Sequence, residues 1–267
     1  MRQMRLMGCF GILLMAAACW PAAAEDSDWC QEQKSWRDQG TVGHAEVREE
    51  RLPASADVLI DPDQNGSIHV HGWANAEIQV KACVRTVALD AGAAAALAKQ
   101  VTITDGPGRV IAKGPEPANQ AWWSVSYEVW VPSAANLELK ADNGSISVDG
   151  TNATIRAHTR NGSLKLKNVS GDVEGKTQNG SLSVDLASGA WQGKGMKLNT
   201  ANGSIDMRLT PGISAEVEAS TVNGRIRNDL AADVKGDDKH EAKFTLGAGG
   251  AKIEARTVNG SVTISGS

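Results

Sequence analysis

The sequence predicts an all-β protein whose main part is a single-stranded parallel β-solenoid, a fold similar to a β-helix. Three observations predict it: an Asn-Gly turn that recurs at a spacing near twenty residues, short alternating strands around each turn, and an aromatic content of only 4%. From Asn143 onward the turns lie 18, 18, 23, 21 and 36 residues apart. The Asn-Gly turns begin at Asn65, Asn143, Asn161, Asn179, Asn202, Asn223 and Asn259.

Each repeat unit contains two short strands and the Asn-Gly turn that joins them. Asn and Gly both tolerate positive φ, so the dipeptide is a strong turn signal. A strand such as Leu164–Leu166 follows the turn, and another ends with a Thr two places before it, as Thr159 does before Asn161. We therefore expect all seven turns to be structural, with Asn in a left-handed conformation that a β-branched replacement tolerates badly.

An antiparallel β meander or sandwich is the alternative that fits the same spacing. In that fold each Asn-Gly closes a two-residue hairpin and places Thr159 opposite Leu164. The sameness of the turns favours the solenoid, because independent hairpins could use Asp-Gly or Gly-Gly equally well, whereas stacked corners favour identical residues that form ladders. The interior must also be thin, since Phe244 is the only Phe after the first 24 residues.

The chain divides into three parts. Residues 1–24 have the pattern of a signal peptide, with two Arg, an apolar run and three Ala at the cleavage site. Lipoprotein processing at Cys19 is disfavoured, because Ala16 stands where a Leu is expected. Residues 25–50 are interpreted as an irregular arm, and residues 51–267 as the β-strand-repeat domain, with one short helix near residues 88–100. We expect an exported protein of the periplasm or cell surface, without a transmembrane segment in the mature chain.

Two cysteines remain after removal of the signal peptide, Cys30 and Cys83. Disulfides persist in exported proteins, so we expect a Cys30–Cys83 bridge that pins the arm to an early strand. Two separate thiols are the alternative.

The sequence contains no convincing motif for a catalytic or metal-binding site. The mature chain is acidic and has no basic blocks, which argues against a nucleic-acid partner. His69 and His71 share one strand face but lack a third ligand, and the calcium-loop pattern that starts at Asp61 has Gly72 where a Glu belongs. No Gly-x-Ser-x-Gly elbow is present. We therefore expect no catalytic residue, no metal and no cofactor.

Two tryptophans are the best candidates for ligand binding. In the alternating stretch of residues 122–132, Trp122 and Trp130 share one strand face with Ser124 and Ser126. Tryptophan faces stack well on sugar rings and on partner proteins, so we interpret Trp122 and Trp130 as candidate binding residues. The structural alternative is that the Ala-rich helix or the N-terminal arm covers this strand and caps the solenoid.

Several motifs resemble one bacterial family. They are Asn65-Gly66-Ser67-Ile68, Gly72-Trp73, Glu77-Ile78-Gln79-Val80, Tyr127-Glu128-Val129-Trp130-Val131-Pro132 and the Asn-Gly-Ser tandem. In this order, over residues 47–267, the chain resembles a β-strand-repeat family of unknown function that is labelled "putative adhesin" and related to adhesin head domains. The resemblance implies a β-solenoid-like domain in a cell-envelope setting and carries no catalytic residues.

These observations together favour an exported, non-enzymatic envelope protein that binds or scaffolds, with an envelope polysaccharide or an envelope protein as partner. One alternative is a β-helix enzyme that acts on polysaccharide. An enzyme would need clustered acids, whereas Asp149, Asp172, Asp185 and Asp206 are scattered along the repeats. A further alternative is an envelope-stress accessory protein with one protein partner.

Overall fold

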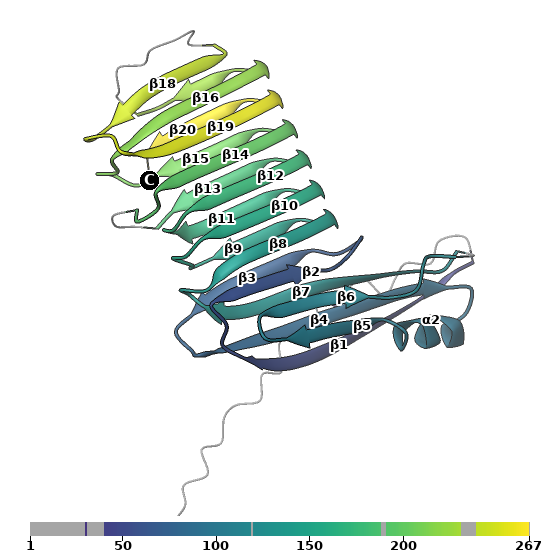
Figure 1. Cartoon of the computed structure of the whole chain (residues 1–267). Helices are drawn as coiled ribbons and strands as arrows, with labels where there is room; N and C mark the ends of the chain where they lie inside the picture. Colours follow the sequence, from purple (N-terminus) through teal and green to yellow (C-terminus); the bar gives the residue numbers. More distant parts are fainter. Residues whose placement is uncertain (1–29, 31–39, 119, 188–190, 231–238, 267) are drawn as a thin grey trace, which may run out of the picture.

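A computed structural model describes residues 30, 40–118, 120–187, 191–230 and 239–266 of the chain. The predicted signal peptide and most of the predicted arm lie outside these residues. Two ten-stranded sheets face each other, and the apolar side chains between them form one continuous core (Figure 1).

Each sheet combines strands from distant parts of the chain. In spatial order, sheet A consists of β1 (Val42–Pro53), β4 (Glu77–Ala88), β7 (Trp122–Pro132), β3 (Ile68–Trp73), β9 (Ile146–Asp149), β11 (Leu164–Val169), β13 (Leu182–Leu186), β15 (Ile205–Leu209), β20 (Val262–Gly266) and β17 (Ile226–Asn228). Sheet B consists, again in spatial order, of β18 (Glu241–Leu246), β16 (Ala215–Asn223), β19 (Ala251–Asn259), β14 (Gly195–Asn202), β12 (Val173–Asn179), β10 (Ile155–Asn161), β8 (Asn136–Asn143), β2 (Asp57–Asp61), β6 (Arg109–Lys113) and β5 (Thr102–Gly106).

The repeat array is a stack of rungs, where a rung is one strand of sheet B, an Asn-Gly corner and the next strand of sheet A. Neighbouring rungs pair in parallel and in register, so Thr159 lies opposite Thr177 and Ala141. The predicted solenoid is thereby confirmed, and the hairpin pairing of Thr159 with Leu164 is wrong. Parallel pairing puts equivalent residues side by side, which is why the repeats keep the same residue at each corner position.

Alternation along each strand places aliphatic residues in the thin interior. In β10, Ile155, Ala157 and Thr159 are buried while Arg156 and Arg160 are exposed. The same pattern recurs in the neighbouring strands, so the core is a set of aliphatic rows that run along the stack.

The asparagine side chains form a continuous ladder along the corners. The amide Nδ2 of Asn161 donates to Oδ1 of Asn143 at 2.8 Å, and Asn179 donates to Asn161 at 2.7 Å. Thr159 adds a hydrogen bond to the corner carbonyl of Gly144 at 2.8 Å. The expected left-handed conformation is wrong, because none of the seven asparagines has a positive φ. The ladder selects Asn through its amide, which both donates and accepts.

The corner glycines are required because the backbones of adjacent corners touch. A Cβ added to Gly162 would overlap the carbonyl of Gly144, and one added to Gly180 would overlap the carbonyl of Gly162. The need for Gly therefore comes from close approach between rungs.

The rungs do not stack in sequence order. The C-terminal rung β19–β20 lies between β14–β15 and the outer rung β16–β17, two rungs that precede it in the sequence. At the other end, β6 and β7 pair in parallel with β2 and β3 and form a further rung without an Asn-Gly corner. Both insertions place segments far apart in sequence side by side (Figure 1).

Antiparallel strands and a helix close the two ends of the stack. At one end β18 pairs antiparallel with β16, and at the other β4 pairs antiparallel with both β1 and β7. The predicted helix is confirmed as α2 (Ala91–Ala98), and Arg48 of β1 donates to the carbonyls of Ala98 and Val101 at its C-terminal end. Residues 42–50, predicted to belong to the irregular arm, instead form the first part of β1, because β4 supplies a full-length partner.

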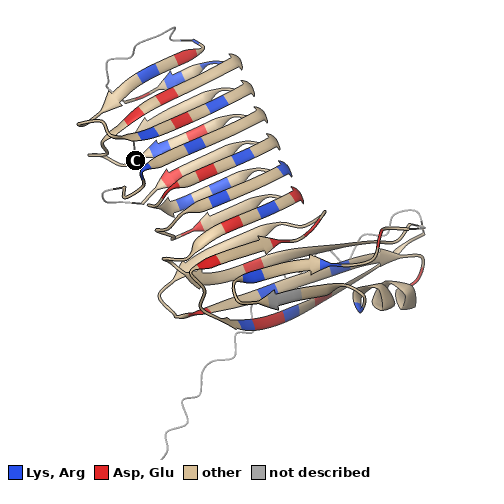
Figure 2. Ribbon diagram, viewed as in Figure 1, with Lys and Arg blue, Asp and Glu red and all other residues tan. Residues whose placement is uncertain are grey.

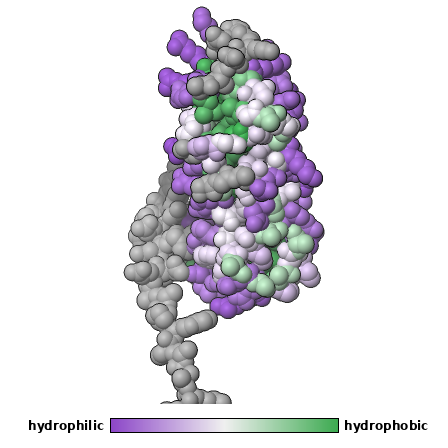
Figure 3. Space-filling view, turned by 90° about the vertical axis from the view of Figure 1, so that its left-hand side faces the viewer, coloured by the Kyte–Doolittle hydropathy of each residue, from purple (hydrophilic) through white to green (hydrophobic). Residues whose placement is uncertain are grey.

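Charged residues cover the outer faces of the stack. On sheet B one row of side chains alternates in charge from rung to rung, and Arg156 lies 3.9 Å from Glu174 within it (Figure 2). The row consists of Glu138, Arg156, Glu174, Lys197 and Glu254. These pairs are exposed and contribute little to stability. Figure 3 shows hydrophobic residues at the surface over the C-terminal rungs, where Ile226, Leu230 and Leu246 are only partly buried. No helix within the described ranges is long and apolar enough to cross a membrane.

We predict that Asn161→Ala and Asn161→Val destabilise the protein equally, by about 1–2 kcal/mol. Each change removes the same two exposed ladder hydrogen bonds. Gly162→Ala should cost more than about 3 kcal/mol, because its Cβ overlaps the neighbouring corner. Urea unfolding measures all three, with Arg160→Ala as an exposed control. A much larger loss for Val than for Ala would indicate backbone strain in place of ladder bonding.

We also predict that a chain ending at Gly250 loses the outer rung as well as the C-terminal one. β17 pairs only with β20 among the described strands, and β16 reaches β14 only through β19. Hydrogen exchange should show that the amides of β16 lose protection while those of β10 keep it. Full protection of β16 in the truncated chain would contradict this dependence.

Candidate functional site

Trp122 and Trp130 both point outward from sheet A, but they occupy separate places. They are eight positions apart in β7, which corresponds to about 27 Å along a strand. The face predicted from alternation is therefore confirmed, whereas the two side chains cannot contact one small ligand together.

Trp130 is held by contacts within the protein. Its ring stacks on His71 with a centroid distance of 5.2 Å, and the Lys81 ammonium lies 5.5 Å from the ring centroid. His71 Nε2 is 3.1 Å from Oε1 of Glu128, and this contact also holds the His71 ring against Trp130. These contacts favour a structural role for Trp130.

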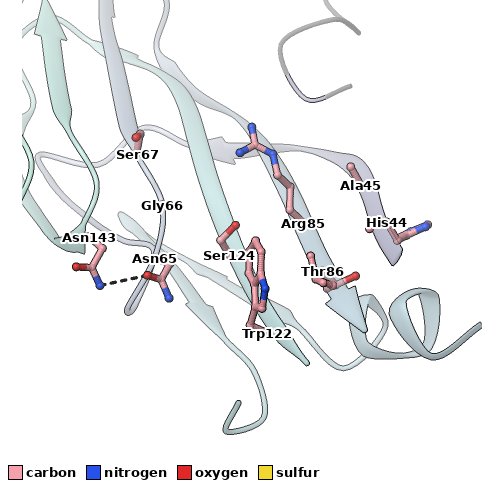
Figure 4. A pocket seen from close by; sticks show the side chains of 12 residues that line it. His44, Ala45, Asn65, Gly66, Ser67, Arg85, Thr86, Trp122, Ser124 and Asn143 are labelled. Atoms are coloured by element: carbon pink, nitrogen blue, oxygen red, sulfur yellow. Dashed lines mark hydrogen bonds between the residues drawn. The ribbon is translucent and has the colours of Figure 1, made fainter. Parts of the chain in front are cut away.

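Trp122 borders a cavity of about 520 Å³ on the outer face of sheet A. The cavity exists because β1 contributes Gly43 and Ala45, whose small side chains leave space beside Val87 and Arg85 of β4. Val87 and Arg85 in turn pair with Trp122 and Ser124 of β7. The indole of Trp122 is 37% exposed and forms one wall (Figure 4).

The corners of two adjacent rungs, β2–β3 and β8–β9, form the opposite wall. Asn65, Ser67 and Asn143 line this side, and the Asn143 amide donates to Oδ1 of Asn65 at 3.1 Å (Figure 4). The wall is rigid, since the backbone carbonyl of Asn65 accepts from the N–H of Val125 and the N–H of Ser67 is 3.3 Å from the hydroxyl of Ser126.

The cavity lining contains hydrogen-bond donors and the guanidinium of Arg85, which is already engaged in an interaction within the protein. Burial lowers the pKa of the Arg85 guanidinium, which nevertheless stays protonated at neutral pH. Among the described residues that line the cavity there is no Asp or Glu. His44 also lines it and has Nε2 3.3 Å from a carboxylate oxygen of Glu46. Such a lining suits a polar ligand that brings acceptors and one apolar ring face.

The disulfide predicted from the cysteine count is present. Cys30 and Cys83 are bonded, with their Cα atoms 5.6 Å apart. Cys83 occupies the outward position of β4 between Lys81 and Arg85, so Cys30 is fixed on the same face of sheet A as the cavity.

Residues 54–265 match the family described as Toastrack DUF4097. The chain belongs to this family. Similar solved structures include a "putative cell adhesion protein" from Clostridium sporogenes, with 12% identity, 83% of this chain and 100% of that chain covered, and a TM-score of 0.47. A "putative adhesin" from Bacteroides fragilis shows 9% identity, 84% and 97% coverage, and a TM-score of 0.43. No curated protein matches the chain.

The other candidate residues of the Toastrack domain are engaged locally. Asp61 accepts the backbone N–H of Asp63 at 2.8 Å in a tight turn, and burial raises the pKa of its carboxyl group. Burial lowers the pKa of His69. His71 belongs to the Trp130 stack. Within the described part of the domain no cluster of three His, Cys, Asp or Glu residues could hold a metal ion.

Arg85, Ser67 and Ser124 are cavity residues that the sequence does not single out. They come from β4, from the first corner and from β7, and only the pairing of β4 with β7 brings Arg85 opposite Ser124. Alternation shows that Arg85 and Cys83 share a face, but no local signal gives the register between two strands so far apart in the chain.

We predict that loss of the disulfide destabilises the Toastrack domain by about 3–4 kcal/mol on the chain-entropy model, since it closes a loop with a sequence separation of 53 residues. The Cys30→Ser, Cys83→Ser double variant should unfold at lower urea concentration than the oxidised protein. Unchanged stability would mean that the closed loop is already restricted in the unfolded chain.

Proposed function

We propose that this Toastrack protein is exported and acts in the cell envelope as a non-enzymatic binding or scaffolding protein. An envelope polysaccharide is the proposed ligand, and the cavity beside Trp122 is the proposed site. The observation that carries the proposal is the exposed indole of Trp122 next to a hollow lined with donors. Aromatic walls with a few convergent polar groups are typical of sugar-binding sites.

Rigidity supports a binding role. The cavity is built on paired strands of sheet A and on a corner held by the ladder, so its shape is set before a ligand arrives. A pre-organised site loses little conformational entropy when the ligand binds. The long stack of rungs supplies the scaffold that would hold this face at a distance from the C-terminal end.

The scattered acids of the repeats support a non-enzymatic role, because three of the four, Asp149, Asp172 and Asp185, have structural contacts. Asp149 accepts the amide of Asn168 at 2.8 Å, and Asp185 lies 3.7 Å from Arg208. Asp172 accepts the backbone N–H of Lys194. A glycoside hydrolase needs two carboxyl groups that face one bound sugar, and these three have other partners.

We predict that Trp122→Ala weakens binding of purified envelope polysaccharide to the mature, disulfide-bonded protein by about ten- to a hundredfold, because the sugar loses its stacking surface. Calorimetric titration measures the affinity, and melting temperature checks that the variant is folded. Trp130→Ala is the matched control, on the same strand and the same face, and should change the affinity less than about twofold.

Two results would contradict the proposal. Equal affinities of the wild type and Trp122→Ala would remove the cavity from the binding site. Release of shorter sugars during the titration would favour the polysaccharide-acting enzyme instead.

A further inference from the structure

We propose that Asn223 is a site of spontaneous deamidation, and that the fold protects the other six Asn-Gly corners from this reaction. All seven corners lie in the described part of the chain. The inference follows from the direction in which the corners bond to one another, and it is independent of the proposed ligand.

Each Asn-Gly corner carries the groups that deamidation needs. The backbone nitrogen of the glycine forms a bond to Cγ of the asparagine, and the side-chain nitrogen leaves with the displaced proton as ammonia. The product is a five-membered succinimide ring, which water opens to aspartate or to isoaspartate. Glycine favours ring closure because it has no Cβ to obstruct the approach. By sequence alone, the seven corners are therefore nearly equivalent.

In six corners the attacking nitrogen is already used by the stack. The N–H of the corner glycine donates to the backbone carbonyl of the asparagine in the neighbouring rung on the side of Asn223, at 2.9–3.2 Å. Ring closure would have to break this hydrogen bond and open the tightly stacked corner. The donors and acceptors are Gly66 and Asn143, Gly144 and Asn161, Gly162 and Asn179, Gly180 and Asn202, Gly203 and Asn259, and Gly260 and Asn223.

Gly224 is the exception, because its corner is the outermost one. The rung β16–β17 is the last that has an Asn-Gly corner, so no asparagine carbonyl follows it. The carbonyls of Lys239 and His240 accept from Ile226 and Thr221, on either side of the corner. The N–H of Gly224 itself has no hydrogen-bond acceptor among the described residues.

The side chain of Asn223 is also less restrained than those inside the stack. Its Nδ2 donates to Asn259 at 2.8 Å, whereas Asn161 has one ladder bond through Nδ2 and another through Oδ1. Asn223 is exposed, so water can reach the ring that forms. Asn65 provides the contrast at the other end: its amide also has one ladder bond to another asparagine, but the N–H of Gly66 is engaged.

Deamidation would alter the outer end of the stack. Either product places a carboxylate where Asn223 now donates to Asn259. Isoaspartate also adds one carbon to the backbone of the corner, which disturbs the register of β17 with β20. The N–H groups of Gly260 and Val262 donate to the carbonyls of Asn223 and Arg225, so these bonds should weaken first.

The first test locates the reaction. The mature, disulfide-bonded protein is incubated at mildly alkaline pH, and mass-spectrometric peptide mapping follows the conversion of each corner. Asn223 should react at least about tenfold faster than any other corner, and in urea-unfolded protein all seven should react at similar rates. Equal rates in the folded protein, or fastest conversion at Asn65, would overturn the inference. So would a preference for Asn223 that persists after unfolding, because it would come from local sequence.

The second test measures the consequence by amide hydrogen exchange. After incubation, the amides of Gly260 and Val262 should exchange faster than before, while that of Gly162 keeps its protection. Asn223→Gln should prevent this change, because its longer side chain would have to close a six-membered ring. Asn65→Gln, at the other end of the ladder, is the matched control and should age as the wild type does. Equal loss of protection in Asn223→Gln would overturn the assignment to Asn223.

Discussion

Close contact between the corners of adjacent rungs is the constraint on which the rest of the structure depends. Sheet strands lie about 4.8 Å apart, and the solenoid keeps this spacing around each turn, so there is no room for a Cβ between Gly162 and Gly144. Polar groups at such a corner must find partners in the next rung. The Asn amide and the Thr159 hydroxyl provide them, and this explains why the residues recur together.

A corner of constant shape also makes the order of the rungs interchangeable. β19–β20 can enter between β14–β15 and β16–β17 because its Asn259 fits between Asn202 and Asn223 as well as any sequential corner would. The sequence does not reveal this order, since an identical repeat carries no information about its neighbour. Only the long interval of 36 residues before Asn259 indicates that another element, β18, intervenes.

The features that follow from local pattern could be predicted from the sequence, and those that follow from distant pairing could not. Alternation identified the buried faces, and the sameness of the turns identified the ladder. The left-handed conformation expected for Asn161 is wrong, because its hydrogen bonds to other rungs override the turn preference of Asn-Gly. β1 was missed because its alternation is weak and β4 forms its partner. Trp122 was found from its strand face, but Arg85 reaches the same cavity only through the register of β4 and β7.

The position of the candidate site follows from the way in which the regular stack ends. A ladder of single-donor, single-acceptor bonds leaves one end with an unused acceptor and the other with an unused donor. The acceptor end lies at Asn223, and the donor end lies at Asn65, where β7 replaces the next corner. Gly43 and Ala45 open a space beside this donor end, and Arg85 also lines it. The two ends of the ladder therefore differ, because one presents an amide donor and the other an amide acceptor.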